Sequence, residues 1–113
     1  MMLEVNGRNV ETDVQGFLAN LNEWSEEFAQ ELAEKDDLQL YNDHWELIYY
    51  FREYHKENMV SPTMHTLIRD LGSKKKHFHD QKAYEKHIYG LFPKDPVHEV
   101  CKLAGLPLPP PDT

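Results

Sequence analysis

The sequence contains one cysteine, five glycines and no long apolar run among its 113 residues. A single cysteine excludes a disulfide within the chain, and the reducing cytoplasm is the simplest setting for a lone thiol. No segment has the length and apolarity of a membrane span, and residues 1–5 show no secretory signal. We therefore expect a cytoplasmic protein that does not associate with a membrane.

Basic residues are also scarce. Lysine and arginine together number 12 against 20 aspartates and glutamates, which gives a formal net charge of -8. Such a charge disfavours general binding to nucleic acid or anionic lipid, because both ligands are themselves negative. A protein partner is the better expectation.

Recognisable catalytic motifs are missing as well. The sequence has no glycine-rich phosphate loop, no paired carboxylates at a catalytic spacing and no Ser-His-Asp signature. We therefore do not expect an independent hydrolase or oxidoreductase, and we predict no bound cofactor.

What the chain does contain is typical of a folded domain. It is 40% hydrophobic and 28% charged, which is too apolar for a disordered chain. The length suits one core, and no internal repeat or second composition block is visible. We predict a single domain over residues 1–113, in which residues 106–113 form an extended arm because prolines prevent a helix there.

Turn and periodicity signals predict a short hairpin followed by about five helices. Asn6 and Gly7 readily adopt the positive φ angles of a two-residue hairpin turn. Ser25 can cap the first helix, and Asp43 with Glu46 has the spacing of a capping box for the second. The expected apolar stripes are Leu21, Trp24, Phe28 and Leu32; residues 45–54; Met64, Leu67, Ile68 and Leu71; Tyr84, Ile88 and Leu91; and Val97, Val100, Cys101 and Ala104.

The last of these helices carries the cysteine. Asp95 can cap it, Pro96 suits its first position, and Gly105 ends it. Cys101 then lies on the inward face. The fold class that follows is mainly all-α, an orthogonal helical bundle with an N-terminal hairpin.

Two C-terminal segments, residues 88–93 and 100–107, resemble the signature of the DsrC/TusE family, including its Cys-Lys-x-Ala-Gly-Leu-Pro block, which begins here at Cys101. Shorter segments agree in the same order along the chain: Leu3 to Gly7, Thr12-Asp13, Gly16 to Leu18, Trp24 to Glu27, His44 to Glu46, and Ser61-Pro62. The resemblance implies a helical fold with a small hairpin and a flexible C-terminal arm.

The resemblance also implies a role as a sulfur carrier. Members of the family pass sulfur as a persulfide on an arm cysteine next to the last residue, and many keep a second cysteine at the position of Cys101. The position that matches the arm cysteine is Asp112, and a carboxylate cannot form a persulfide. Cys101 is therefore the only possible sulfur acceptor, with His98, Lys102, Gly105 and Asp112 as its predicted neighbours.

Two roles follow from the resemblance. In the first, the chain binds a sulfurtransferase complex or dissimilatory-type sulfite reductase proteins and accepts sulfur at Cys101, where His98 or Lys102 could favour the thiolate. In the second, the chain is a regulatory or adaptor member that has lost persulfide transfer. By spacing alone, a lone cysteine on an apolar stripe is more often an inert packing residue.

A histidine-rich loop leaves two weaker alternatives. His77 and His79 could share one metal ion, but no nearby cysteine or acidic ligand completes the set, so we predict no metal site. The basic residues within 62–79 could contact DNA phosphates. The net negative charge argues against this, and a solvated loop is the simpler interpretation.

Overall fold

Helices make up most of the described chain, which comprises residues 1–74 and 80–109 of a computed structural model. The elements are β1 (Met2–Val5), β2 (Arg8–Glu11), the short 3-10 helix η1 (Leu21–Glu23), α1 (Glu26–Lys35), α2 (Asn42–Asn58), α3 (Met64–Gly72), α4 (Gln81–Leu91) and α5 (Pro96–Leu103). The predicted fold class, mainly helical with an N-terminal hairpin, is confirmed. No helix in these two ranges is both long and apolar enough to cross a membrane.

The N-terminal hairpin forms as its turn residues predict. Asn6 and Gly7 have φ angles of 52° and 79°, so both central turn residues have positive φ. The strands β1 and β2 are antiparallel, with Leu3 opposite Val10. Both of these side chains are buried, and β1 packs against α1, so the hairpin covers that helix.

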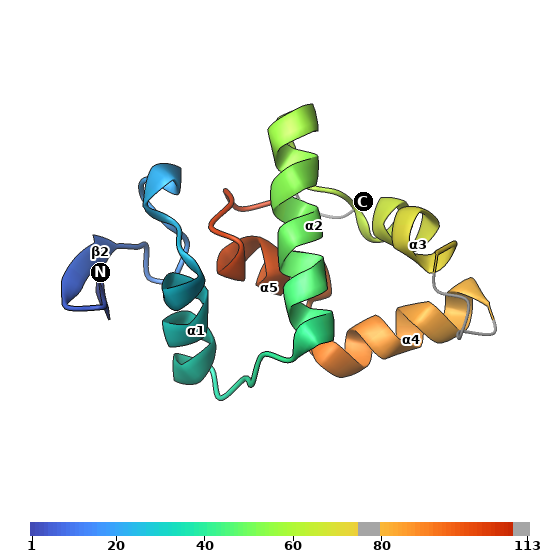
Figure 1. Ribbon diagram of the computed structural model, residues 1–113, viewed down its shortest axis with the longest axis horizontal. Coiled ribbons are helices and arrows are strands. Elements are labelled where there is room, and N and C mark those ends of the chain that lie inside the picture. Colours follow the sequence, from blue (N-terminus) through green and yellow to red (C-terminus); the bar gives the residue numbers. More distant parts are fainter. Residues whose placement is uncertain (75–79, 110–113) are drawn as a thin grey trace.

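Helix α2 stands at the centre of the molecule (Figure 1). The hairpin and α1 lie on one side of it, and α3 and α4 lie together on the other. Its inward face presents Leu47, Ile48 and Phe51, each at most 1% exposed. Helix α5 packs against α1, α2 and α4, which brings the C-terminal signature into the middle of the fold.

The predicted start of α2 is wrong. Its N-cap is Tyr41, and Asp43 lies two residues later, within the first turn, where it pairs with His87 at 2.9 Å. The first turn is held by His44 instead, whose Nδ1 accepts a hydrogen bond from the Tyr41 amide at 3.1 Å. An imidazole nitrogen thus satisfies a backbone donor at the N-terminus of this helix, where carboxylates usually do so.

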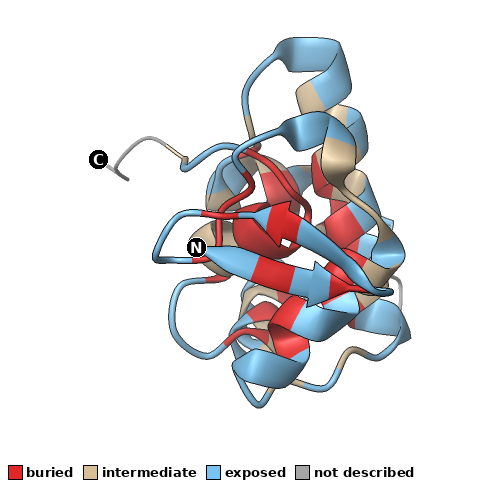
Figure 2. Ribbon diagram, turned by 90° about the vertical axis from the view of Figure 1, so that its left-hand side faces the viewer, coloured by how far each residue is buried: buried red, intermediate tan, exposed pale blue. Residues whose placement is uncertain are grey.

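The other predicted caps are confirmed. Ser25 accepts a hydrogen bond from the Phe28 amide at 3.1 Å, and Asp95 accepts one from the His98 amide at 3.3 Å. Buried residues occur in the hairpin strands as well as in the helices, and much of the surface around them is exposed (Figure 2).

Candidate functional site at the end of helix α5

The C-terminus of α5 closes in a complete Schellman motif. Gly105 adopts a left-handed conformation, with φ +72°, which glycine tolerates best. Its amide donates to the Lys102 carbonyl at 3.3 Å, and the next amide, from Leu106, donates to the Cys101 carbonyl at 2.9 Å. In this motif the residue after the glycine commonly packs against the residue that accepts its bond. Cys101 and Leu106 accordingly share one buried core.

Two distant side chains satisfy the remaining carbonyls at this helix end. Trp24 donates from Nε1 to the Leu103 carbonyl at 2.8 Å, and Arg52 donates from Nη1 to the Ala104 carbonyl at 2.8 Å. The Arg52 guanidinium also lies 3.8 Å from the centroid of the Trp24 ring. Burial lowers the pKa of Arg52, yet arginine stays protonated in proteins, so the cation and the ring attract each other. We call Trp24 and Arg52 the clasp.

Cys101 lies two residues before Leu103, in the last turn of α5. The residue is 0% exposed, and its inward position is confirmed. Burial raises the pKa of the thiol to about 11; a hydrogen bond with Ser61 acts in the opposite direction, and the Asp95 carboxylate raises the pKa further. At neutral pH Cys101 therefore holds about a hundredfold less thiolate than an ordinary cysteine. In this closed form it is a poor nucleophile.

The two predicted neighbours that could have promoted the thiolate have other partners. Lys102 is buried, and its Nζ lies 2.8 Å from Asp36 Oδ2 and 3.5 Å from Glu99 Oε2. Burial lowers the pKa of Lys102, but the hydrogen bond with Asp36 and the charge of Glu99 outweigh it, and the net direction is upward. His98 packs edge-on against Phe17, with ring centroids 5.1 Å apart. An effect of either residue on the thiol stays a prediction.

The other two predicted neighbours of Cys101 are Gly105 and Asp112. Gly105 lies directly against Trp24, because a Cβ atom there would be 2.5 Å from the ring atom Cδ1. Asp112 lies outside the described residues, as do His77 and His79. Within residues 1–74 and 80–109, no group of three or more potential ligands could hold a metal ion.

Sequence reasoning missed the clasp and Ser61. The sequence pattern predicts Trp24 on the apolar stripe of the first helix, whereas it precedes α1, and no pattern predicts a role for Arg52. Arginine is a recognised partner for carbonyls at a helix C-terminus, but usually from within the same helix. The clasp acts across 79 and 52 residues of sequence, a distance over which local patterns carry no signal.

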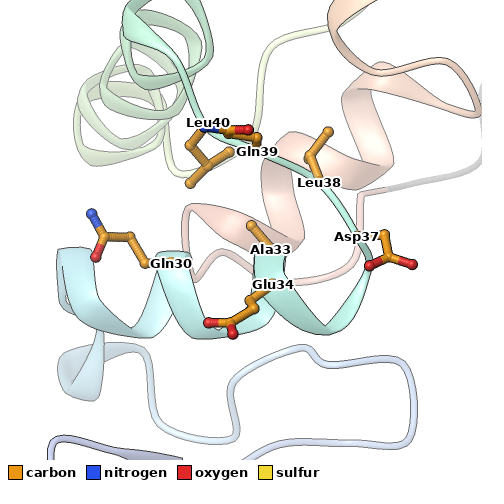
Figure 3. A pocket seen from close by; sticks show the side chains of 7 residues that line it. All are labelled: Gln30, Ala33, Glu34, Asp37, Leu38, Gln39 and Leu40. Carbon is orange, nitrogen blue, oxygen red and sulfur yellow. The ribbon is translucent and has the colours of Figure 1, made fainter.

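A surface hollow of about 430 Å³ lies between α1 and the segment 37–40 that follows it (Figure 3). Two partly buried leucines, Leu38 and Leu40, line it together with the carboxylates Glu34 and Asp37. Of the predicted sulfur-site residues that the structure describes, none lines this hollow. The buried thiol, and not this hollow, is the candidate centre for sulfur chemistry.

Comparison with known proteins gives the family. The family model described as "DsrC like protein" matches residues 4–111. The chain belongs to the DsrC/TusE family. "Sulfurtransferase TusE" of Photorhabdus laumondii is 38% identical to it over 109 residues, which is 96% of each chain.

Solved structures agree with this membership. The NMR structure of Allochromatium vinosum DsrC matches with a TM-score of 0.85 and 35% identity, covering 99% of this chain and 97% of that one. The crystal structure of the oxidized gamma-subunit of the dissimilatory sulfite reductase (DsrC) from Archaeoglobus fulgidus matches with a TM-score of 0.82 and 33% identity over the whole of both chains. The fold and the order of its elements are therefore those of the family.

Proposed function

We propose that this DsrC/TusE family member takes part in sulfur relay, binding a sulfurtransferase or a dissimilatory-type sulfite reductase partner and accepting sulfur at Cys101. The observation that carries the proposal is that Cys101, the one thiol of the sequence, lies on α5 within the residues that the family model matches. A cytoplasmic location, which would keep this thiol reduced, fits the proposal.

The transfer step needs a thiolate and a persulfide donor. The Cys101 thiol gives up its proton to the medium, and the thiolate attacks the outer sulfur of the donor's persulfide. A new S–S bond forms at Cys101, the S–S bond of the donor breaks, and the donor leaves as a thiolate that takes up a proton. No electrons are gained or lost overall, so the step needs no separate oxidant or reductant.

Burial sets a condition on this step. A donor cannot reach a sulfur atom in a residue with 0% exposure, and desolvation keeps that sulfur protonated. The end of α5 must therefore open before transfer, and we infer that it opens when a partner binds. Opening would also return the pKa toward its ordinary value, because the desolvation that raises it would be relieved.

Persulfide loading tests the proposal. The chain is incubated with a sulfurtransferase that carries isotopically labelled persulfide, and its intact mass is then measured for wild type and for Cys101→Ser. We expect one added sulfur on wild type and none on the variant. No added sulfur on wild type, with a donor that loads a standard thiol protein, would rule out carriage.

The same pair of proteins separates carriage from an adaptor role. If the chain acts only as an adaptor, a captured partner should bind wild type and Cys101→Ser with equal affinity while neither gains sulfur. A tenfold weaker affinity of the variant for the partner corresponds to about 1.4 kcal/mol. That result would count against the adaptor role, in which the helical body binds the partner without help from the thiol.

A further inference from the structure

We propose that Trp24 and Arg52 are positioning residues that keep Cys101 closed, and that release of this clasp is the local opening which admits a reagent or donor to the thiol. The part of this inference that concerns a sulfur donor rests on the proposed function. The part that concerns closure does not.

The clasp satisfies carbonyls that have no other route to a partner while the fold is closed. Leu103 and Ala104 are both 0% exposed, so water cannot replace the donors until the segment moves. An unpaired buried carbonyl costs about 1–3 kcal/mol, and hydrogen bonds from a charged donor such as Arg52 are among the stronger ones. Loss of either donor therefore favours a conformation in which the end of α5 meets water.

The same turn connects the clasp to the thiol. The carbonyls of residues 103 and 104 belong to the second and third residues after Cys101, and the Leu106 amide donates to the Cys101 carbonyl. Trp24 is the outer wall of this turn, because its ring lies against Gly105. When the ring withdraws, the left-handed turn loses its nearest contact, although Leu18 still lies against Gly105, and the bond from Leu106 to Cys101 is the next to break.

The clasp is also placed where a visiting molecule can disturb it. Trp24 and Arg52 are only partly buried, whereas the groups they hold are fully buried. They come from the segment before α1 and from the middle of α2, so a shift between these two elements would part the ring from the guanidinium. Access to the thiol is thus controlled from the surface without unfolding of the core.

The rate of alkylation of Cys101 by iodoacetamide, followed by intact mass, tests the inference. Because the sequence has one cysteine, every modified molecule reports on this site. Trp24→Phe keeps a ring but removes the Nε1 donor, and Arg52→Met keeps a long side chain but removes the guanidinium. Matched controls are Trp45→Phe, a partly buried tryptophan of α2, and Arg69→Met, whose side chain is 62% exposed.

We expect both clasp variants to react at least about tenfold faster than wild type, and both controls to stay within about twofold. The rates are measured again at low urea concentrations. Reaction through a local opening changes little with urea, whereas reaction through global unfolding rises steeply. Hydrogen exchange of the Leu106 amide in wild type should report the same opening without any substitution.

Two results would overturn the inference. One is a clasp variant that reacts no faster than its control. The other is an acceleration fully accounted for by the loss of global stability in urea unfolding, since the clasp would then be a structural support only. Neither measurement uses a sulfur donor, so failure of persulfide loading and failure of the clasp are separate outcomes.

Discussion

A methyl group added at Gly105 should destabilise the protein by roughly 2–5 kcal/mol. The left-handed backbone at φ +72° costs a non-glycine residue about 1–2 kcal/mol. The new Cβ would also lie 2.5 Å from Trp24 Cδ1 and 2.9 Å from Cγ, and overpacking of this kind typically costs about 1–3 kcal/mol. The ring cannot move away freely, because Nε1 is bonded to the Leu103 carbonyl and Arg52 stacks on its face.

Urea unfolding followed by circular dichroism measures this cost, and the chain supplies two matched controls. Gly7→Ala meets the same kind of backbone, at φ +79°, but no atom within 4 Å, so it should cost only the backbone term of about 1–2 kcal/mol. Gly90→Ala lies in a helix with no atom within 4 Å and should stabilise by roughly 0.5–1 kcal/mol. If Gly105→Ala costs no more than Gly7→Ala, the packing of Trp24 against the turn is refuted.

Three further predictions concern titratable groups. The pKa of Cys101 is raised from 9.0 to about 11. The stability due to the neutral thiol is therefore present below pH 9 and falls by about 3 kcal/mol as the pH rises to 11. The difference in free energy of unfolding between wild type and Cys101→Ala, measured in urea, should narrow over the same range. Burial lowers the pKa of His44, so the stability due to the neutral imidazole is present above pH 6.5 and is lost as the pH falls below that value. In His44→Gln the free energy of unfolding should therefore depend less on pH below 6.5. Lys102→Met removes the bond to Asp36 and should cost about 1–3 kcal/mol in thermal unfolding, whereas an unchanged melting temperature would show that the ion pair is not stabilising.

Local signals predicted much of the fold correctly. The Asn6 and Gly7 turn, the Ser25 and Asp95 caps and the glycine at the end of α5 all depend on chemistry within a few residues, and each is present in the structure. The predicted start of α2 is wrong because a histidine ring holds the first turn, where the sequence pattern predicts a carboxylate, and histidine is not a usual capping residue.

For the candidate site, too, local signals predict one part of the arrangement and long-range packing determines the rest. Helical periodicity predicts the inward face on which the thiol lies, whereas the role of the block beginning at Cys101 as the sulfur site stays a prediction. The near-complete burial of the thiol, the bond to Ser61 and the clasp of Trp24 and Arg52 depend on how distant elements pack. No spacing within the sequence encodes those contacts.

The central claim is that the buried Cys101 thiol becomes accessible for sulfur transfer when a partner binds. The most direct test is the rate at which Cys101 gains sulfur from a labelled persulfide. This rate is measured by intact mass, with and without a sulfurtransferase that binds the chain. A small-molecule persulfide should load the isolated protein slowly, and the bound sulfurtransferase should load it many times faster at equal persulfide concentration. Equal rates in the two settings, or no sulfur gained in either, would contradict that claim.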